Sequence, residues 1–154
     1  MMGRTHLAIG LLIALLLLPL LNPSSLWLYL GLVLLGALLP DVDHEGSMIN
    51  HFLPITRWVP FFFKHRGFFH SLFPPIIMAG IALWYGAPAI GLYLCIGYLS
   101  HLLSDAMTRS GVRFLHPLSD IKLSGFVSTG GIIEWIVFIG VVLLTVAVGK
   151  YWAF

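Results

Sequence analysis

Charged residues are scarce in this 154-residue chain: Asp, Glu, Lys and Arg make up 9% of it, whereas hydrophobic residues make up 59%. A typical globular domain carries about 25% charged residues. This composition excludes an ordinary soluble domain and predicts an integral membrane protein. The formal net charge is only +2, and no basic stripe with interleaved aromatic residues is present, so a nucleic-acid partner is not expected.

Cysteine is almost absent, since Cys95 is the only one. A single cysteine excludes an intrachain disulfide, and its place in an apolar stretch argues against thiolate ligation of a metal. Any metal site must therefore be built from histidine and carboxylate. Internal repeats and low-complexity linkers are also absent, so residues 1–154 are expected to form a single transmembrane domain.

Five apolar runs predict an all-α membrane protein with about five transmembrane helices: 7–21, 26–39, 72–85, 89–106 and 132–149. Several runs fall short of the ~20 residues of a full span, so we expect their polar ends to extend them into the interface. The segment near 52–64 is too short to span and is expected to lie at headgroup depth with its aromatic residues. The first run has the outline of a signal peptide, but no small-x-small cleavage site follows it, so a retained helix is preferred.

Lysine and arginine are distributed unequally between the two sides of this topology. One side holds Arg4, Arg57, Lys64, Arg66, Arg109, Arg113 and Lys122, and the other holds Lys150. The positive-inside rule therefore places the N-terminus and the two long connections in the cytoplasm and the C-terminus outside. The polar face is therefore expected at the cytoplasmic side of the membrane.

The same topology brings the ionisable residues of the helix ends to one side of the membrane. His6, His70 and Glu134 begin the first, third and fifth helices, and Asp41, Asp43, His101 and Asp105 end the second and fourth. His101 and Asp105 are four residues apart, so they share one helix face. An ionisable group in a membrane costs several kcal/mol unless it faces partners, and such groups indicate a functional site. We therefore predict one site at the cytoplasmic surface.

Imidazole and carboxylate ligands suit zinc, with manganese or iron(II) as less favoured alternatives. The pool of candidate ligands exceeds the need of one ion: His6, Asp41, Asp43, His65, His70, His101, Asp105 and Glu134. A site with two or three ions bridged by Asp105 would activate water and clamp the oxygens of a phosphoester. Arg66 would fork onto a phosphate oxygen. Arg66, Asp105 and Asp43 are the predicted catalytic residues.

Each of these assignments has a structural alternative. His101 and Asp105 would also serve as a hydrogen-bonded pair between helices, Asp41 and Asp43 as turn residues, and Glu134 as a partner of the helix dipole alone. The sequence leaves open whether four further residues join the site: His44, Glu45, His116 and Asp120. The last two are four residues apart, but the proline between them argues against a continuous helix.

Three segments resemble the motifs of a known family: PDVDH (40–44), HRGFFHSL (65–72) and GYLSHLLSD (97–105), with Thr5 and His6 near the start. The family is that of the bacterial and archaeal inner-membrane proteins identified as metal-dependent hydrolases. The order of the histidines and aspartates is also distantly similar to the ligand order of zinc-dependent phospholipase C, in which the aspartate of HxxxD bridges metal ions. These resemblances imply a hydrolase that acts on phosphoesters.

The leading hypothesis is an inner-membrane, metal-dependent hydrolase, phospholipase- or phosphodiesterase-like, that cleaves a phosphoester of a membrane lipid at the cytoplasmic face. A metal-ion transporter is the first alternative, although most of the apolar runs offer no polar path across the membrane. A lipid-binding regulatory protein with a structural metal is the second. The sequence does not determine the lipid, the bond cleaved, the number of ions or the oligomeric state.

Overall fold

The computed structural model describes the whole chain except residues 53–55, 57, 63–65 and 153–154. The described helices are α1 (Gly3–Leu21), α2 (Leu26–Leu38), η1 (Leu39–Asp43), α3 (Met48–Phe52), α4 (Val59–Phe62), η3 (Phe68–His70), α5 (Phe73–Trp84), α6 (Pro88–Ala106) and α7 (Ile132–Trp152). Within this described part, β pairing is limited to two isolated bridges in the 107–131 connection. The prediction of an all-α membrane protein is confirmed.

Four segments are long and apolar enough to cross a membrane: Gly3–Leu21, Leu26–Asp43, Pro88–Ala106 and Ile132–Tyr151. The expected third span is shorter than predicted, because α5 has 12 residues and is therefore only about 18 Å long. The described fold thus has four spanning helices and one shorter apolar helix where we expected about five spans. The predicted interfacial segment, 52–64, contains α4 and lies partly outside the described residues.

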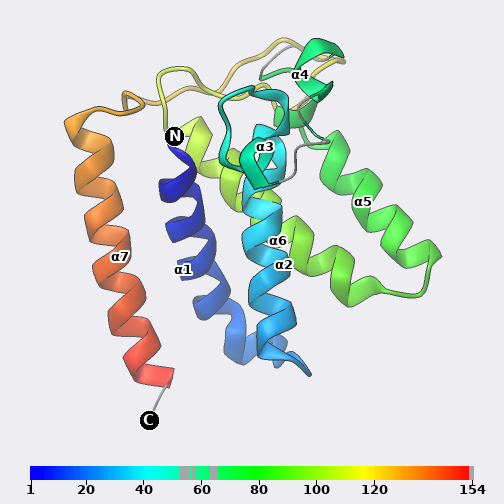
Figure 1. Ribbon diagram of the computed structural model, residues 1–154, viewed down its shortest axis with the longest axis vertical. Coiled ribbons are helices and arrows are strands. Elements are labelled where there is room, and N and C mark those ends of the chain that lie inside the picture. The colour runs from blue at the N-terminus through cyan, green and yellow to red at the C-terminus, as the bar shows by residue number, and fades with distance from the viewer. Residues whose placement is uncertain (53–55, 57, 63–65, 153–154) are drawn as a thin grey trace.

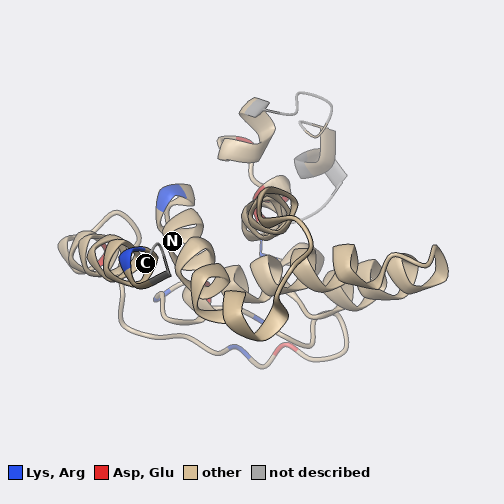
Figure 2. Cartoon of the chain, turned by 90° about the horizontal axis from the view of Figure 1, so that it is seen from below, with Lys and Arg blue, Asp and Glu red and all other residues tan. Residues whose placement is uncertain are grey.

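The polar connections lie together at one end of the helices, which we call the polar end. Figure 1 shows the N-terminus, the region of η1 and α3, and the 107–131 connection at this end, with the C-terminus at the opposite one. Charged residues are confined to the connections and the ends of the helices (Figure 2). The predicted grouping of helix ends at one side therefore holds, even though α5 is short.

The central helix α6 packs against α1, α2 and α5. It approaches α2 so closely that glycine is required on both helices. A Cβ on Gly97 would collide with the carbonyl oxygen of Val33, and one on Gly36 would collide with the carbonyl oxygen of Leu94. Small residues allow such backbone contact between membrane helices. The close approach brings the polar end of α6, with His101 and Asp105, against the last turn of α2.

We expect Gly97→Ala to lower the free energy of unfolding by about 1–3 kcal/mol, as overpacking of a close contact does. The new methyl group meets backbone atoms, which cannot rotate away. Gly31→Ala is the matched control on α2, because nothing lies within 4 Å of a Cβ built there. Thermal unfolding of both variants in the same detergent measures the difference, and equal melting temperatures would contradict the packing described.

Candidate metal centre

Six histidine and aspartate side chains from four elements meet at the polar end. They are His6 from α1, Asp41 and Asp43 from η1, His70 from η3, and His101 and Asp105 from α6. The three imidazoles are fully buried, and Asp43 and Asp105 are nearly so. Asp41 is the more accessible member, with 17% of its side chain exposed. A buried cluster of this kind requires that each polar atom be accounted for.

His101 has its ring orientation set by the backbone of α2. Its Nδ1 donates to the carbonyl oxygen of Ala37 at 2.8 Å, in a turn where helix carbonyls lack helical partners. The proton is therefore on Nδ1, and Nε2 carries a lone pair. That Nε2 is buried without a hydrogen-bond partner among the described residues. It lies 3.7 Å from Asp41 Oδ1 and 4.0 Å from Asp105 Oδ2, too far for a hydrogen bond.

His70 is oriented in the same way by a carboxylate. Its Nδ1 donates to Asp43 Oδ2 at 3.3 Å, and its Nε2 faces Asp41 Oδ1 at 3.8 Å and Asp105 Oδ2 at 3.7 Å. Metal-ligating histidines almost always donate their second ring nitrogen to such a partner. Asp43 thus orients His70, and its role as a direct ligand stays a prediction.

His6 is held by Ser104. The Ser104 hydroxyl lies 2.8 Å from the carbonyl oxygen of His101, and donation there leaves its oxygen to accept from His6 Nδ1 at 2.7 Å. His6 Nε2 then faces Asp105 Oδ1 at 3.4 Å. The same nitrogen is 3.1 Å from the Met1 carbonyl oxygen, which permits the other tautomer. Binding of a cation to Nε2 would select the first tautomer, because it requires a free lone pair.

Two overlapping triads have ligand atoms within 4.8 Å of one another: His6, Asp41 and His101, and His70, His101 and Asp105. Ligand atoms that surround one zinc ion at 2.0–2.1 Å lie about 3.3 Å apart. The observed separations of 3.7 to 4.0 Å around His70 and His101 are a few tenths of an ångström wider. A small inward movement of these side chains would therefore complete the coordination.

Asp105 is placed to bridge two ions. The rings of His6 and His101 are stacked, with centroids 3.6 Å apart and an angle of 9° between planes, and their Nε2 atoms face different oxygens of Asp105. The Nε2 lone pairs of two parallel rings at this separation would suit two ions ~3.5–4 Å apart. Cationic groups stand at the same oxygens in this structure, the Met1 amino group at Oδ1 and Arg66 at Oδ2.

Arg66 joins the cluster through both its backbone and its side chain. Its φ of 61° is unusual for a residue with a side chain, and its backbone N–H donates to Asp43 Oδ2 at 3.1 Å. The guanidinium reaches Asp105 Oδ2 at 3.1 Å and donates to the Gly111 carbonyl oxygen at 2.9 Å. Strained backbone of this kind is concentrated at functional sites. The structure thus brings all three predicted catalytic residues together.

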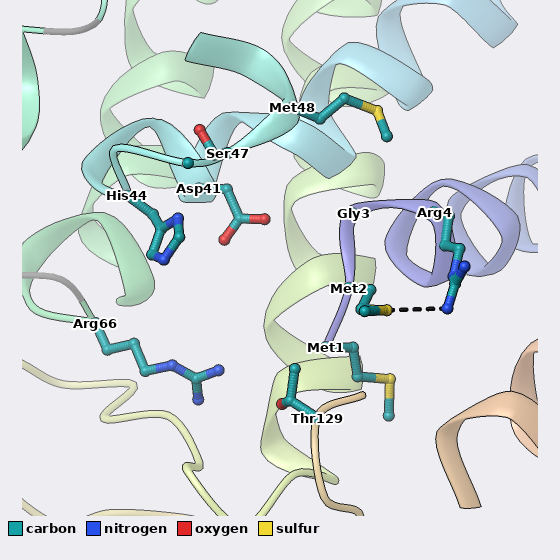
Figure 3. A pocket seen from close by; sticks show the side chains of 11 residues that line it. Met1, Met2, Gly3, Arg4, Asp41, His44, Ser47, Met48, Arg66 and Thr129 are labelled. Carbon is teal, nitrogen blue, oxygen red and sulfur yellow. Dashed lines mark hydrogen bonds between the residues drawn. The ribbon is translucent and has the colours of Figure 1, made fainter. Parts of the chain in front are cut away.

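A pocket of about 470 Å³ opens above the cluster (Figure 3). Residues from several elements line it, among them Met2, Arg4, Asp41, His44, Met48 and Arg66. Figure 3 shows Asp41 and Arg66 on facing parts of its wall, and His44 beside Asp41. The histidines of the cluster are buried behind these residues. A ligand that enters the pocket would therefore meet Asp41 and Arg66 first.

Other predicted site residues lie outside the cluster or outside the described chain. Glu134 accepts from Met2 N and Thr5 Oγ1 with one oxygen, at 2.6 and 2.8 Å, and from Gly130 N with the other, at 2.6 Å. It ties α7 to the start of α1, and the structure does not bring it to the metal ligands. His65 lies outside the described residues.

Three of the four undecided residues are distant from the cluster by their contacts or exposure. His116 and Asp120 pair with each other at 3.6 Å in the 107–131 connection. Glu45 is exposed. His44 is the exception, because it lines the pocket.

Two supporting side chains escaped the sequence analysis. Ser104 orients His6, and Thr108 accepts from Arg66 Nη1 at 3.4 Å while its hydroxyl donates to the Asp105 carbonyl oxygen. Their positions beside Asp105 were available in the sequence, because Ser104 precedes it on α6 and Thr108 lies in the turn that follows. The carbonyl of Ala37 offers no signal at all in the sequence, because every residue has one.

Comparison with known proteins gives a family match over nearly the whole chain. Residues 1–153 match the family model described as "YdjM inner membrane protein". The chain is also similar to "Uncharacterized protein YvsG" of Bacillus subtilis, with 38% identity over 111 residues, which are 70% of this chain and 69% of that protein. No solved structure matches.

Two relatives carry the name "Inner membrane protein YdjM", one from Escherichia coli and one from Shigella flexneri. Each is 34% identical over 108 residues, which are 64% of this chain and 54% of the relative. The match therefore spans about half the length of these two proteins.

We expect Ser104→Ala to weaken zinc binding by about 10–100-fold, the usual effect of removing a partner that orients a ligating histidine. The substitution removes the acceptor of His6 Nδ1 and leaves every carboxylate of the cluster in place. Ser100→Ala is the control, because Ser100 lies one turn earlier on α6 and donates to the Gly97 carbonyl oxygen. Competition with a chromophoric chelator measures both affinities, and equal affinity in the two variants would contradict the role of Ser104.

Proposed function

The chain belongs to the family of YdjM inner membrane proteins and is a multi-pass inner membrane protein. From the geometry of its cluster we propose that it is the metal centre of a lipid phosphoester hydrolase. The observation that carries the proposal is the orientation of three imidazoles. Each has a protein acceptor at Nδ1 and turns Nε2 toward Asp41 or Asp105. A hydrogen-bonded packing network would use both ring nitrogens, whereas metal ligation needs one of them free. His101 carries this argument, because its Nε2 is buried without a hydrogen-bond partner among the described residues.

The charge of the cluster also favours a cation. The cluster holds the carboxylates of Asp41, Asp43 and Asp105, and the Arg66 guanidinium and the Met1 amino group both contact Asp105. A buried carboxylate is stabilised by a cation or by several donors. His101 Nε2, which faces Asp41 and Asp105, supplies no proton, because the proton of this ring is on Nδ1. A divalent ion between nitrogen and oxygen would satisfy both sets of lone pairs.

Each residue has a distinct task in the proposed reaction. A bound divalent ion, with zinc preferred, supplies Lewis-acid activation of water and of the phosphoryl oxygens. Arg66 has a guanidinium that can fork onto a phosphate oxygen, and its Nη1 is anchored on Gly111. Asp105 would serve as a ligand through both of its oxygens. Asp43 positions His70 and Arg66 and does not itself line the pocket. Asp41 lines the pocket, through which substrate and water would arrive.

A membrane lipid is the proposed substrate because of where the pocket lies. It opens at the polar end of a membrane-embedded helix bundle, close to headgroup depth, and its wall combines cations with methionines. By the positive-inside rule this end faces the cytoplasm, which would supply water. A lipid can reach such a site laterally within the bilayer, with its phosphate at the level of Arg66.

The geometry favours hydrolysis over the two alternatives. A transporter needs ionisable residues along a path, but His, Asp and Glu are absent from residues 7–40, 71–100 and 135–154. A purely structural metal has all its positions filled by protein, whereas a catalytic ion keeps an open one. The 17% exposure of Asp41 at the pocket leaves one side of the proposed centre accessible to ligands.

The test is release of headgroup or phosphate from defined phospholipids by the zinc-loaded protein in detergent. We expect Asp105→Asn to abolish turnover and Arg66→Lys to lower kcat/KM by about 10²-fold with zinc content unchanged, because lysine cannot make the bidentate contact. Arg109→Lys, at an exposed position, is the control. Full metal-dependent turnover in Asp105→Asn would remove the proposed centre.

A further inference from the structure

A second cavity lies directly behind the metal ligands. It is a groove of about 310 Å³ between η1, η3, α4, α5 and α6, and its described lining is almost wholly apolar, with Leu39, Val42, Phe68, Phe69, Ile77 and Met78 among its residues. These elements gather at the polar end on the side of α5 (Figure 1). Ile77 is 49% exposed, so the groove opens on the outer face of the helices, where lipid lies.

The groove shares its supporting elements with the metal centre. Val42 lies between Asp41 and Asp43 on η1, and Phe69 precedes His70 on η3. Consecutive Cα atoms are only 3.8 Å apart, so these two short turns contribute neighbouring residues to the groove and to the metal centre. Tyr98 closes the groove from α6 and donates its hydroxyl to the Phe69 carbonyl oxygen, which satisfies the one hydroxyl there.

We propose that this groove binds an acyl chain of the lipid whose phosphoester is held at the metal centre. The inference rests on the proposed function and specifies its substrate as an amphiphile with a long hydrocarbon chain. The two cavities differ in the groups that they offer: the first has two arginines and the carboxylate of Asp41 beside its methionines, and the second has almost only aliphatic and aromatic side chains. An amphiphile bound at η1 and η3 would have its phosphate near Arg66 and its chain in the groove.

The volume of the groove sets a chain-length limit. A methylene group occupies about 30 Å³, similar to the share of a water molecule in the liquid, so an open groove of about 310 Å³ accommodates at most about ten methylenes. Each methylene taken from water strengthens binding about fourfold. KM for monomeric phosphodiesters should therefore fall with each added methylene until about ten are present, and then stay level.

The first experiment measures binding without turnover. The protein is reconstituted in phosphatidylethanolamine/phosphatidylglycerol vesicles that contain phosphatidylglycerol with a diazirine on an early acyl carbon, and adducts are located by mass spectrometry after illumination. We expect adducts at Val42, Phe69 and Met78 in the wild type and equally in Asp105→Asn, whose groove is unchanged. Met78→Trp, which fills the groove, should lose them. Ile77→Trp is a second variant at an exposed position, in case Met78→Trp does not fold.

The control for lipid contact in general is α7, whose Ile139 is 52% exposed. Ile139→Trp should leave the groove adducts unchanged. Labelling of the groove no stronger than labelling of α7, or labelling that survives both Met78→Trp and Ile77→Trp, would overturn the proposal.

The second experiment separates failure of the groove from failure of the proposed function. In nanodiscs of one composition, Met78→Trp should raise KM at least about tenfold for a phosphodiester with a ten-carbon chain and leave bis(4-nitrophenyl) phosphate turnover unchanged. The substrate partitions into the nanodisc to the same extent for the wild type and for Met78→Trp, so this partition cancels in the ratio of their KM values. Groove-specific adducts without hydrolysis of any phosphoester would support the groove and overturn the enzyme. Hydrolysis that is independent of chain length and of Met78→Trp would support the enzyme and overturn the groove.

Discussion

The hydrogen bond from His101 Nδ1 to the Ala37 carbonyl oxygen is the interaction on which the candidate metal centre depends. It joins α6 to α2 and fixes which ring nitrogen of His101 faces the cluster. It forms only because Gly36 and Gly97 let the two backbones touch. In a bilayer, where apolar surface gives little drive for helices to associate, such close packing and the hydrogen bonds that it permits hold the helices together.

The rest of the polar end extends the same principle. Histidines and carboxylates can be buried there because each is oriented by a second group: Ser104 for His6, Asp43 for His70, and Ala37 for His101. Arg66 adds a link between η1 and α6, since its backbone contacts Asp43 and its side chain contacts Asp105. The cost of burying polar groups in a membrane protein is thus offset by a network with one open side. That side is where the pocket lies.

Much of this arrangement follows from sequence pattern alone. The apolar runs determine which residues lie at helix ends, and an alternating path through the membrane then groups His6, Asp41, His70, His101 and Asp105 at one side. Local spacing adds that His101 and Asp105 share a helix face. These inferences succeed because they depend on hydropathy and chain direction, which are one-dimensional properties.

What the sequence could not supply depends on tertiary contacts. Glu134 has the same helix-end position as His6, yet it is used by the backbone of Met2 and Gly130. Asp43 and Asp41 differ by two positions on a 3-10 turn, and only the fold decides which one faces the pocket. The apolar run 72–85 also includes Leu72 and Tyr85, which the structure places at the two caps of α5.

The central claim is that the polar end binds a transition metal, and elemental analysis of the purified protein tests it most directly. The account predicts about one to three equivalents of metal per chain, chiefly zinc, with loss of metal in folded His101→Ala and retention in Glu134→Gln. Glu134 is the informative control because it is equally buried but has its own partners. A folded wild-type protein that cannot be loaded with any divalent transition metal would contradict the account, and the cluster would then be a helix-packing network.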